Sequence, residues 1–326
     1  MKKAFILIAV IVAATLAIRS YNSCVFHVEK ETRFMMGTYV TIYAIGPKKL
    51  ASKAIDSALC RMQEIDVKFN PLNPKSPIYV FNHTGAPISD PEILGLIRIA
   101  LDVSKESGGA FDITVAPLLE LWGFYGKDLY IPKKQELKDC LSKVGYRHLS
   151  LNNGKLKRDR AGVKIDLGGI AKGYALEQAV KVLKSEGVHS ALVDAGGDIY
   201  ALGKKGNRLW KIGIKNPRGG DVLEYVEVED LAVMSSGDYE RFFIKDGKRQ
   251  HHIFNPKTGH PTEGVASVTL IYSDPVLAQP WAKIPFVLGA EKGLKMLEKI
   301  PGMKAIVITD SGEKFYIKGR NVAKKI

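Results

Sequence analysis

The sequence predicts an α+β fold, because patterns typical of helices give way to patterns typical of strands beyond residue 190. Residues 48–69 place apolar side chains three and four positions apart, as an amphipathic helix does. After residue 190, short stretches rich in β-branched and aromatic residues follow one another. Their connections are short, and Asp246-Gly247 and Ser311-Gly312 are typical of hairpin turns. Short connections favour antiparallel pairing, which places the chain in the α+β class.

The expected helices follow in chain order. The first covers residues 48–69. A second starts at Asp90, a capping residue followed by proline, and stops near residues 108–109. A third runs from about residue 133 to 144, and a fourth follows the glycines at 168–169 and stops near Gly187. The expected strands are residues 191–193, 211–214, 225–228, 241–244, 266–272, 305–309 and 314–317.

The N-terminus predicts export. Two lysines precede an apolar run at residues 4–18, which is shorter than the roughly 20 residues that span a bilayer. Cys24 suggests lipoprotein processing, which would leave the chain acylated and tethered to a membrane. An uncleaved anchor and simple secretion stay open. We therefore expect a signal peptide or membrane anchor over residues 1–23 and one domain over residues 24–326.

The net charge limits the classes of binding partner, and the number and spacing of the cysteines limit disulfides and zinc sites. The formal net charge of +14 suits phosphate-bearing ligands or anionic lipid. No stripe of Arg and Lys with interleaved aromatics occurs, so we do not expect nucleic acid as a partner. Cys60 and Cys140 can form at most one disulfide and fit no zinc pattern, so we expect two buried, inert thiols.

The stretch at residues 163–173, VKIDLGGIAKG, organises the chain. Its first four residues alternate like the end of a strand, Gly168 and Gly169 allow a close backbone approach, and a helix follows. A turn at a helix N-terminus can bind an anion, because free N–H groups and the helix dipole point at it. Asp166 and Lys172 flank this turn with opposite charges. A plain strand-to-helix connection would have the same pattern.

Further unusual stretches follow one another in the chain: GAFDITVAPL at 109–118, LVDAGGDI at 192–199, SSGDYE at 235–240 and HIFNPKTG at 252–259. With MGT at 36–38 and FVLG at 286–289, the set resembles the ApbE family, the FAD:protein FMN transferases, formerly described as thiamine-biosynthesis lipoproteins. The resemblance runs from about residue 33 to residue 289. It implies a fold of two lobes of mainly antiparallel sheet with packed helices and a flavin cleft between them.

The resemblance also implies an activity and its partners. Family members transfer FMN from FAD to a Thr or Ser of an exported protein and release AMP; acceptors include the Nqr and Rnf redox subunits. The chain would act in the cell envelope, on the periplasmic side of the inner membrane. The positions that correspond to FAD contacts are Met36, Ala110, Phe111, Asp112, Asp166, Lys172, His252 and Ile253. The aromatic side chains that could wall the flavin are Phe111, Trp122, Phe124 and Tyr239.

His252 is the candidate base for the attacking hydroxyl, since histidine can move a proton near neutral pH. An ordinary strand histidine is the competing interpretation, and Asp238 could serve as the base instead. Two alternatives to transfer also stay open. The chain could be an exported FAD-binding protein without transfer activity, or an FAD pyrophosphatase in which water replaces the hydroxyl.

The resemblance implies Mg²⁺ at the Gly169 carbonyl and at two side chains, which fall on Gln279 and Lys283. Family members carry Asp and Thr there. Gln offers a neutral oxygen, and a protonated Lys offers no lone pair. Pro280 and Pro285 also strain a continuous helix through this segment. We therefore expect weak Mg²⁺ binding, or none without FAD, and a Lys283 ammonium close to the FAD pyrophosphate.

Overall fold

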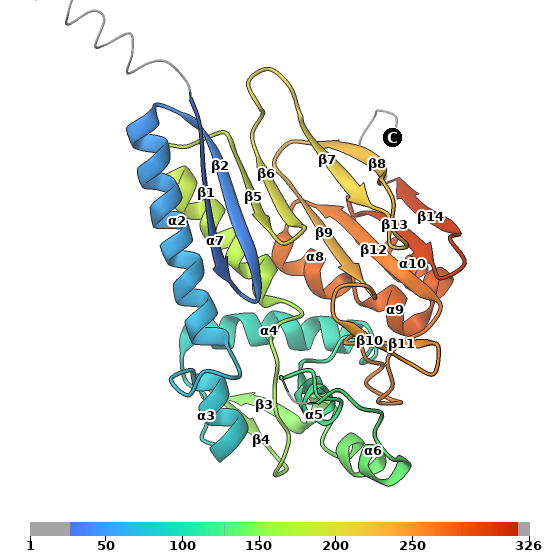
Figure 1. The fold of residues 1–326 in the computed structure, drawn as a ribbon. Coiled ribbons are helices and arrows are strands. Elements are labelled where there is room, and N and C mark those ends of the chain that lie inside the picture. Colours follow the sequence, from blue (N-terminus) through green and yellow to red (C-terminus); the bar gives the residue numbers. More distant parts are fainter. Residues whose placement is uncertain (1–26, 127, 319–326) are drawn as a thin grey trace, which may run out of the picture.

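The computed structural model describes residues 27–126 and 128–318 (Figure 1). An eight-stranded sheet dominates it, in the order β1-β2-β5-β6-β9-β12-β13-β14, and every neighbouring pair is antiparallel. The α+β class is thus confirmed. The strands are β1 (His27–Met35), β2 (Thr38–Gly46), β5 (Ala191–Ala195), β6 (Asp198–Leu202), β9 (Leu231–Gly237), β12 (Val265–Tyr272), β13 (Lys304–Thr309) and β14 (Lys314–Lys318).

Helices pack against this sheet and bury its apolar side chains in the main core. They are α2 (Lys48–Phe69), α7 (Ala171–Ser185), α8 (Pro275–Trp281), α9 (Ile284–Leu288) and α10 (Ala290–Leu297). A second core is formed by the hairpin of β7 (Trp210–Lys215) and β8 (Val222–Val228), which covers outward residues such as Val233 and Ile306 of the sheet. Among the described residues, we find no helix that combines the length and the apolar character needed to cross a membrane.

Below the sheet in Figure 1 lies a more helical part with its own small core, formed by Trp122, Phe124, Leu137 and Phe254 among others. Its elements are α3 (Pro77–Thr84), α4 (Pro91–Glu106), the 3-10 turns η1 (Ile113–Val115) and η2 (Tyr146–His148), α5 (Ala116–Leu121), α6 (Lys134–Leu141), the hairpin β3 (Leu149–Asn152)–β4 (Lys155–Arg158), and the hairpin β10 (Phe242–Lys245)–β11 (Lys248–His251). The candidate functional site lies between this part and the end of the sheet.

Most predicted elements are confirmed, including α2 at its predicted bounds and the Asp90 cap, whose Oδ1 accepts from the N–H groups of Glu92 and Ile93. The strand expected at residues 163–166 is wrong. This segment belongs to no strand, and its Asp166 N–H donates to the Ile113 carbonyl of a 3-10 turn. The Asn82 side chain takes the partner's place, because its amide bonds both the N–H and the C=O of Ile165 at 2.8 Å.

The cysteine expectation is half wrong. Cys140 is buried, whereas Cys60 lies exposed on α2, and both are free thiols. Cys60 is on the solvent face of the helix, where its sulfur lies 3.6 Å from an Arg33 guanidinium nitrogen. The expected leader at residues 1–23 and Cys24 lie outside the described residues.

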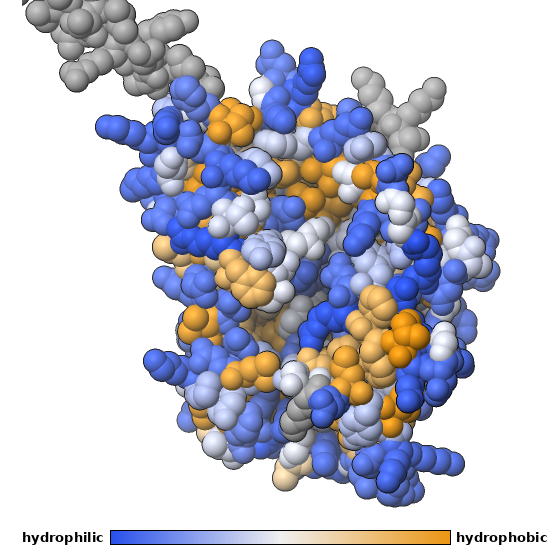
Figure 2. All heavy atoms as spheres, in the orientation of Figure 1, coloured by the Kyte–Doolittle hydropathy of each residue, from blue (hydrophilic) through white to orange (hydrophobic). Residues whose placement is uncertain are grey.

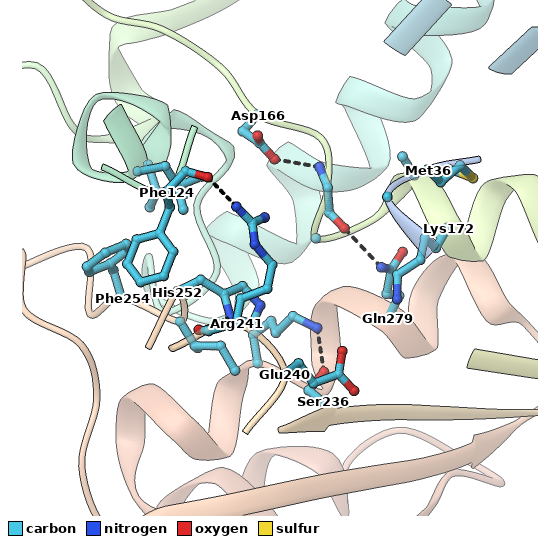
Figure 3. A pocket seen from close by; sticks show the side chains of 18 of the residues that line it. Met36, Phe124, Asp166, Lys172, Ser236, Glu240, Arg241, His252, Phe254 and Gln279 are labelled. Carbon is cyan, nitrogen blue, oxygen red and sulfur yellow. Dashed lines mark hydrogen bonds between the residues drawn. The ribbon is translucent and has the colours of Figure 1, made fainter. Parts of the chain in front are cut away.

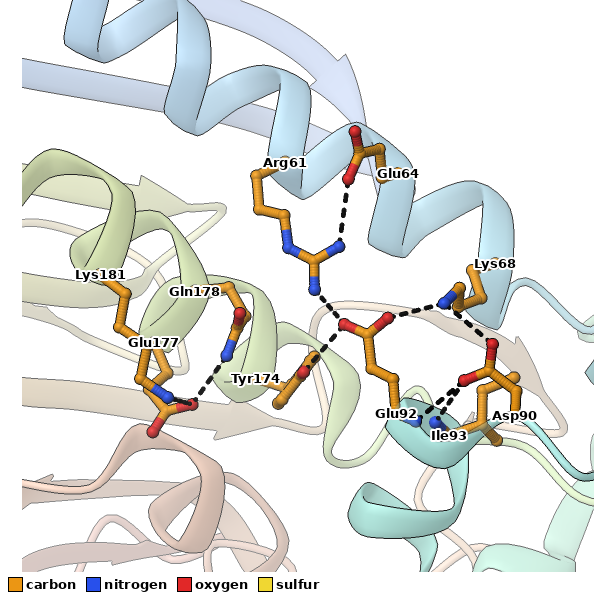
Figure 4. A network of polar contacts seen from close by, with 10 residues as sticks. All are labelled: Arg61, Glu64, Lys68, Asp90, Glu92, Ile93, Tyr174, Glu177, Gln178 and Lys181. Carbon is orange, nitrogen blue, oxygen red and sulfur yellow. Dashed lines mark hydrogen bonds and ion pairs between the residues drawn. The ribbon is translucent and has the colours of Figure 1, made fainter. Parts of the chain in front are cut away.

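A polar network joins α2, α4 and α7 (Figure 4). Glu92, at the start of α4, pairs with Arg61 and with Lys68 (2.7 Å) of α2, and accepts a 2.8 Å hydrogen bond from the Tyr174 hydroxyl of α7. Lys68 also pairs with Asp90 at 3.0 Å. Each charge of this network therefore has an opposite charge beside it, and the network ties the three helices together.

Candidate functional site

A hollow opens between the sheet and the helical part, and Figure 2 shows it near the middle of the face. Its volume is about 850 Å³, at the upper end of the usual range for small-molecule sites. Each motif of the sequence contributes to its wall: the β1–β2 turn, residues 110–112, the glycine turn, the end of β9, residues 252–256 and the α8–α9 segment. Segments far apart in the chain thus meet in one pocket.

The glycine turn forms one wall and leads into the N-terminus of α7. Asp166 shapes it, because its Oδ1 accepts the Gly168 N–H at 2.6 Å and its Oδ2 accepts the Tyr125 hydroxyl at 2.6 Å. Neither glycine has a positive φ. Their lack of a side chain serves close packing instead: a Cβ at Gly169 would lie 2.9 Å from Cε2 of Phe111. The turn therefore presents bare backbone to the pocket.

Lys172, in the first turn of α7, is paired with the Asp198 carboxylate at the start of β6. Asp198 is buried and also accepts the Ser235 N–H at 3.1 Å. Burial alone would lower the pKa of Lys172, but Asp198, with help from Glu240 and Asp194, raises it instead. Lys172 is therefore a fixed cation on the pocket wall. Its contact with a phosphate of FAD stays a prediction.

Gln279 of α8 holds the glycine turn against α7 (Figure 3). Its Oε1 accepts the Gly173 N–H at 2.8 Å and its Nε2 donates to the Gly168 carbonyl at 3.0 Å. The side chain is buried. Gly173 lets α8 approach so closely, since a Cβ there would lie 2.1 Å from the Pro275 carbonyl oxygen. The amide thus acts as a clamp between two helices and the turn.

Lys283 lies between α8 and α9, where the helix is interrupted just before Pro285 as expected, whereas Pro280 lies inside α8. Its ammonium contacts the Ser236 hydroxyl of β9 and lines the pocket. Burial lowers the pKa of Lys283 to about 8; Asp198 and Glu240 oppose this fall and Lys172 adds to it. Its positive charge is only partly compensated by the surrounding residues.

His252 follows β11 and faces the pocket across from the glycine turn (Figure 3). Its Nδ1 lies 3.3 Å from the Arg241 carbonyl oxygen. A carbonyl can only accept, so Nδ1 carries the proton and Nε2 is left with a free lone pair. Burial, followed by the positive charges of Arg241, Lys283 and His251, lowers the pKa of His252 to about 3. The imidazole is therefore neutral.

Aromatic side chains form the apolar wall: Phe111, Phe124, Tyr239 and Phe254. Trp122 does not join them. It is buried in the small core and donates its indole N–H to the Gly259 carbonyl at 3.0 Å, so the expectation that it walls the pocket is wrong. At the opposite rim, Met36 holds a left-handed backbone with φ 54°, which is costly for a side chain and marks a constrained turn.

The remaining predicted residues divide between wall and support. Ala110, Asp112 and Ile253 line the pocket. Asp112 is engaged by the backbone of two turns, because Oδ1 accepts the Thr114 N–H at 2.8 Å in η1 and Oδ2 accepts the Tyr146 N–H at 2.7 Å in η2. Burial raises its pKa, and these hydrogen bonds oppose the rise.

Asp238 does not line the pocket. Its Oδ1 accepts from Arg218 at 2.8 Å and from Arg249 at 3.1 Å, on the other side of the strand end. Both guanidinium groups hold the carboxylate away from the pocket, where it cannot reach a hydroxyl bound there. This placement does not suit the alternative in which Asp238 is the base.

The pocket also contains residues for which no role was predicted. The polar and charged ones include Tyr125, Lys215, Ser236, Glu240 and Arg241. Arg241 donates to the Phe124 carbonyl and lies 5.8 Å above the Phe124 ring, so it ties β10 to the aromatic wall. Burial raises the pKa of Glu240, against the lysines that face it.

The donor set does not fit Mg²⁺. The Gln279 amide is already bonded on both sides, and Lys283 brings a positive charge to the other expected ligand position. Within residues 27–126 and 128–318, no group of three or more His, Cys, Asp or Glu side chains is arranged to hold a metal. The Gly169 carbonyl therefore lacks both of the side-chain partners that the resemblance implies.

Comparison with known proteins agrees with the motifs. The family model described as the ApbE family matches residues 36–307. Proteins named FAD:protein FMN transferase from Treponema pallidum and Vibrio cholerae are each 32% identical, over 82% and 86% of this chain and 80% and 88% of theirs. The crystal structure of the ApbE protein from Thermotoga maritima has a TM-score of 0.84 at 36% identity and covers 90% of this chain and 97% of its own. The flavin transferase ApbE from Vibrio cholerae has a TM-score of 0.82 at 28% identity, over 90% of this chain and 98% of its own.

Proposed function

Because the chain belongs to the ApbE family, we propose that it is an FAD:protein FMN transferase, the activity in the names of its relatives. One observation carries the proposal. A bare glycine turn at a helix N-terminus, two lysines and a neutral histidine with a free Nε2 face one pocket large enough for a dinucleotide. Such a site can hold a pyrophosphate and deprotonate a hydroxyl beside it.

The pyrophosphate of FAD belongs at the glycine turn. The N–H groups of Ala171 and Gly173 are already bonded, to the Leu167 carbonyl and to Gln279, so the Lys172 ammonium and the dipole of α7 supply the positive charge there. The aromatic wall of Phe111, Phe124 and Tyr239 suits the flat rings of the cofactor. FAD should therefore bind more tightly than riboflavin, which lacks the phosphates.

In the transfer itself, the oxygen of an acceptor Thr or Ser forms a bond to the phosphorus next to riboflavin. The bond from that phosphorus to the bridging oxygen breaks, and its electron pair leaves on the phosphate of AMP. The hydroxyl proton goes to His252 Nε2. The products are protein-linked FMN, AMP and one proton, and positioning with charge neutralisation does most of the work.

His252 can act as this base because FAD changes its surroundings. In the free protein the charges of Arg241 and Lys283 disfavour the imidazolium, after burial. The pyrophosphate brings negative charge to the same pocket and should raise the pKa of His252 toward neutrality. The histidine would thus become an effective base when the substrate arrives.

We further propose that the chain is exported and that its acceptors are extracytoplasmic subunits of redox pumps, of the Nqr and Rnf type. The apolar run at residues 4–18 and Cys24 support export with a membrane tether. The basic net charge of +14 would favour an anionic membrane surface.

The test is to mix the purified protein with FAD and the extracytoplasmic domain of an Nqr- or Rnf-type subunit, and to look for flavin fluorescence in a denaturing gel. We expect fluorescence in the acceptor band and release of AMP. Free FMN with AMP and no labelled acceptor would indicate a pyrophosphatase. FAD binding without either product would indicate a binding protein without transfer activity.

A further inference from the structure

Lys283 occupies a defined position on the pocket wall. Its ammonium touches the hydroxyl of Ser236, a buried residue of β9, on the same side of the pocket as the Lys172–Asp198 pair. The charged groups that face it are Asp198, Lys172 and Glu240. Because a buried residue holds it, the Lys283 ammonium has a fixed position in the site, unlike the ammonium of a solvent-exposed lysine.

Gln279, four residues earlier, is not free to bind a metal. Exchanging its amide O and N would place NH₂ against the Gly173 N–H and oxygen against the Gly168 carbonyl, which loses both hydrogen bonds. The NH₂ group is therefore fixed toward the turn. A cation near Gly169 would meet this amide and the Lys283 ammonium instead of two oxygen ligands.

The positive charge that a pyrophosphate needs is nevertheless present. Asp198 is neutralised by Lys172, and burial raises the pKa of Glu240, the other carboxyl group that faces Lys283, so the Lys283 charge is only partly compensated within the pocket. An ammonium cannot impose octahedral geometry, but it can neutralise phosphate oxygens as a point charge, and it repels a divalent ion from the same place.

We infer that the Lys283 ammonium takes the place of a divalent cation at the FAD pyrophosphate, so that this chain binds FAD and transfers FMN without a metal. The transfer step rests on the proposed function. As the phosphorus–oxygen bond breaks, the electron pair that leaves on the AMP phosphate is neutralised by Lys283. The binding step does not depend on an acceptor and can be tested alone.

The experiment measures FAD and riboflavin binding by fluorescence quenching, in EDTA and in Mg²⁺. For the unaltered protein we expect FAD dissociation constants within about twofold of each other in the two buffers. Lys283→Gln should weaken FAD binding in EDTA by about tenfold or more, since it removes a charge-assisted contact, and should leave riboflavin binding unchanged. Lys283→Arg, which keeps the charge, should retain most of the FAD affinity.

Lys211→Gln is the matched control, because this exposed lysine of β7 lies over Tyr225, outside the pocket. It loses the same charge and should bind FAD normally. The double change Gln279→Asp with Lys283→Thr should make FAD binding depend on Mg²⁺. Thermal unfolding of each variant shows whether it is folded.

Two results would overturn the inference: FAD binding to the unaltered protein that EDTA abolishes, or an FAD affinity in EDTA that Lys283→Gln leaves unchanged. Failure of the proposed function would be a different result. In that case FAD binding would remain metal-independent and sensitive to Lys283, but no acceptor would be labelled.

Discussion

Two clusters of charged side chains lie on opposite faces of α7. In one cluster the neighbouring groups stabilise the charged forms, and in the other burial destabilises most of them. Tyr174 points to the Glu92 network (Figure 4), and Lys172, two residues earlier, points to the pocket (Figure 3). In the network, partial burial alone would raise the pKa values of Asp90 and Glu92, but Lys68 and other donors lower both. Every charge there is stabilised.

In the pocket, most pKa shifts disfavour the charged form of the side chain. Burial raises the pKa values of Asp112 and Glu240 and lowers those of His252 and Lys283. Lys172 is the exception, because Asp198 raises its pKa against the effect of burial. The charges of the network are therefore satisfied by their own neighbours. In the pocket Lys283 has no full counter-charge, as expected where an anionic ligand is to supply one.

The largest expected effect is on catalysis. His252→Ala should lower the transfer rate by about 10²–10⁴-fold, the usual contribution of a general base, with FAD affinity within a few-fold. The measurement is the rate of acceptor labelling at saturating FAD. Unchanged labelling would make His252 an ordinary buried histidine.

Next comes the stabilised cluster. Glu92→Ala should destabilise the protein by about 2–4 kcal/mol, because Arg61, Lys68 and the Tyr174 hydroxyl lose a shared partner. Glu64→Ala is the control, since Glu64 pairs with the same Arg61 but its side chain is 67% exposed, and it should cost about 0.5 kcal/mol or less. Urea unfolding measures both. Equal effects would contradict the description of the network as structural.

Lys172 should matter for the ligand. Lys172→Ala should weaken FAD binding by about 1.5–3 kcal/mol and leave riboflavin binding nearly unchanged, because the contact is to phosphate. Lys181→Ala, on the exposed side of the same helix and paired with Glu177, should change neither. Equal affinity of the unaltered protein for FAD and riboflavin would contradict a phosphate site at the glycine turn.

The sequence predicts those elements whose side-chain pattern shows which face is buried or where the element begins. The helix α2 has a continuous apolar face, and Asp90 and Pro91 mark the start of α4. It does not reveal β1, whose alternation is carried by charged residues at the edge of the sheet, nor α8, seven residues long with a proline inside. At residues 163–166 the pattern is that of a strand, but the partner is the Asn82 side chain, which only the folded chain brings there.

The candidate site likewise contains residues that the sequence predicts and residues that it does not. Motifs predicted Met36, Phe111, Lys172 and His252, all of which line the pocket. Arg241 carries no motif of its own and reaches the site because β10 packs on Phe124. Asp238 lies inside a motif, yet its side chain turns away to Arg218 and Arg249, a choice of side that depends on where β9 ends.

The contrast between a charge-satisfied network and a pocket with an uncompensated charge is tested most directly by thermal unfolding. The unaltered protein and Lys283→Gln are compared in EDTA at pH 7, with and without FAD. The pKa of Lys283 is lowered to about 8 in the folded state, so the unfolded chain holds this proton more tightly. The resulting destabilisation is full below pH 8 and disappears as the pH rises toward the ordinary pKa of lysine. Removing the charge should therefore stabilise the free protein, by on the order of 1–3 kcal/mol. We expect the variant to melt at a higher temperature without FAD and to gain less from added FAD. A variant that melts lower, or that gains as much from FAD, would contradict the view that the pocket holds this charge for its ligand.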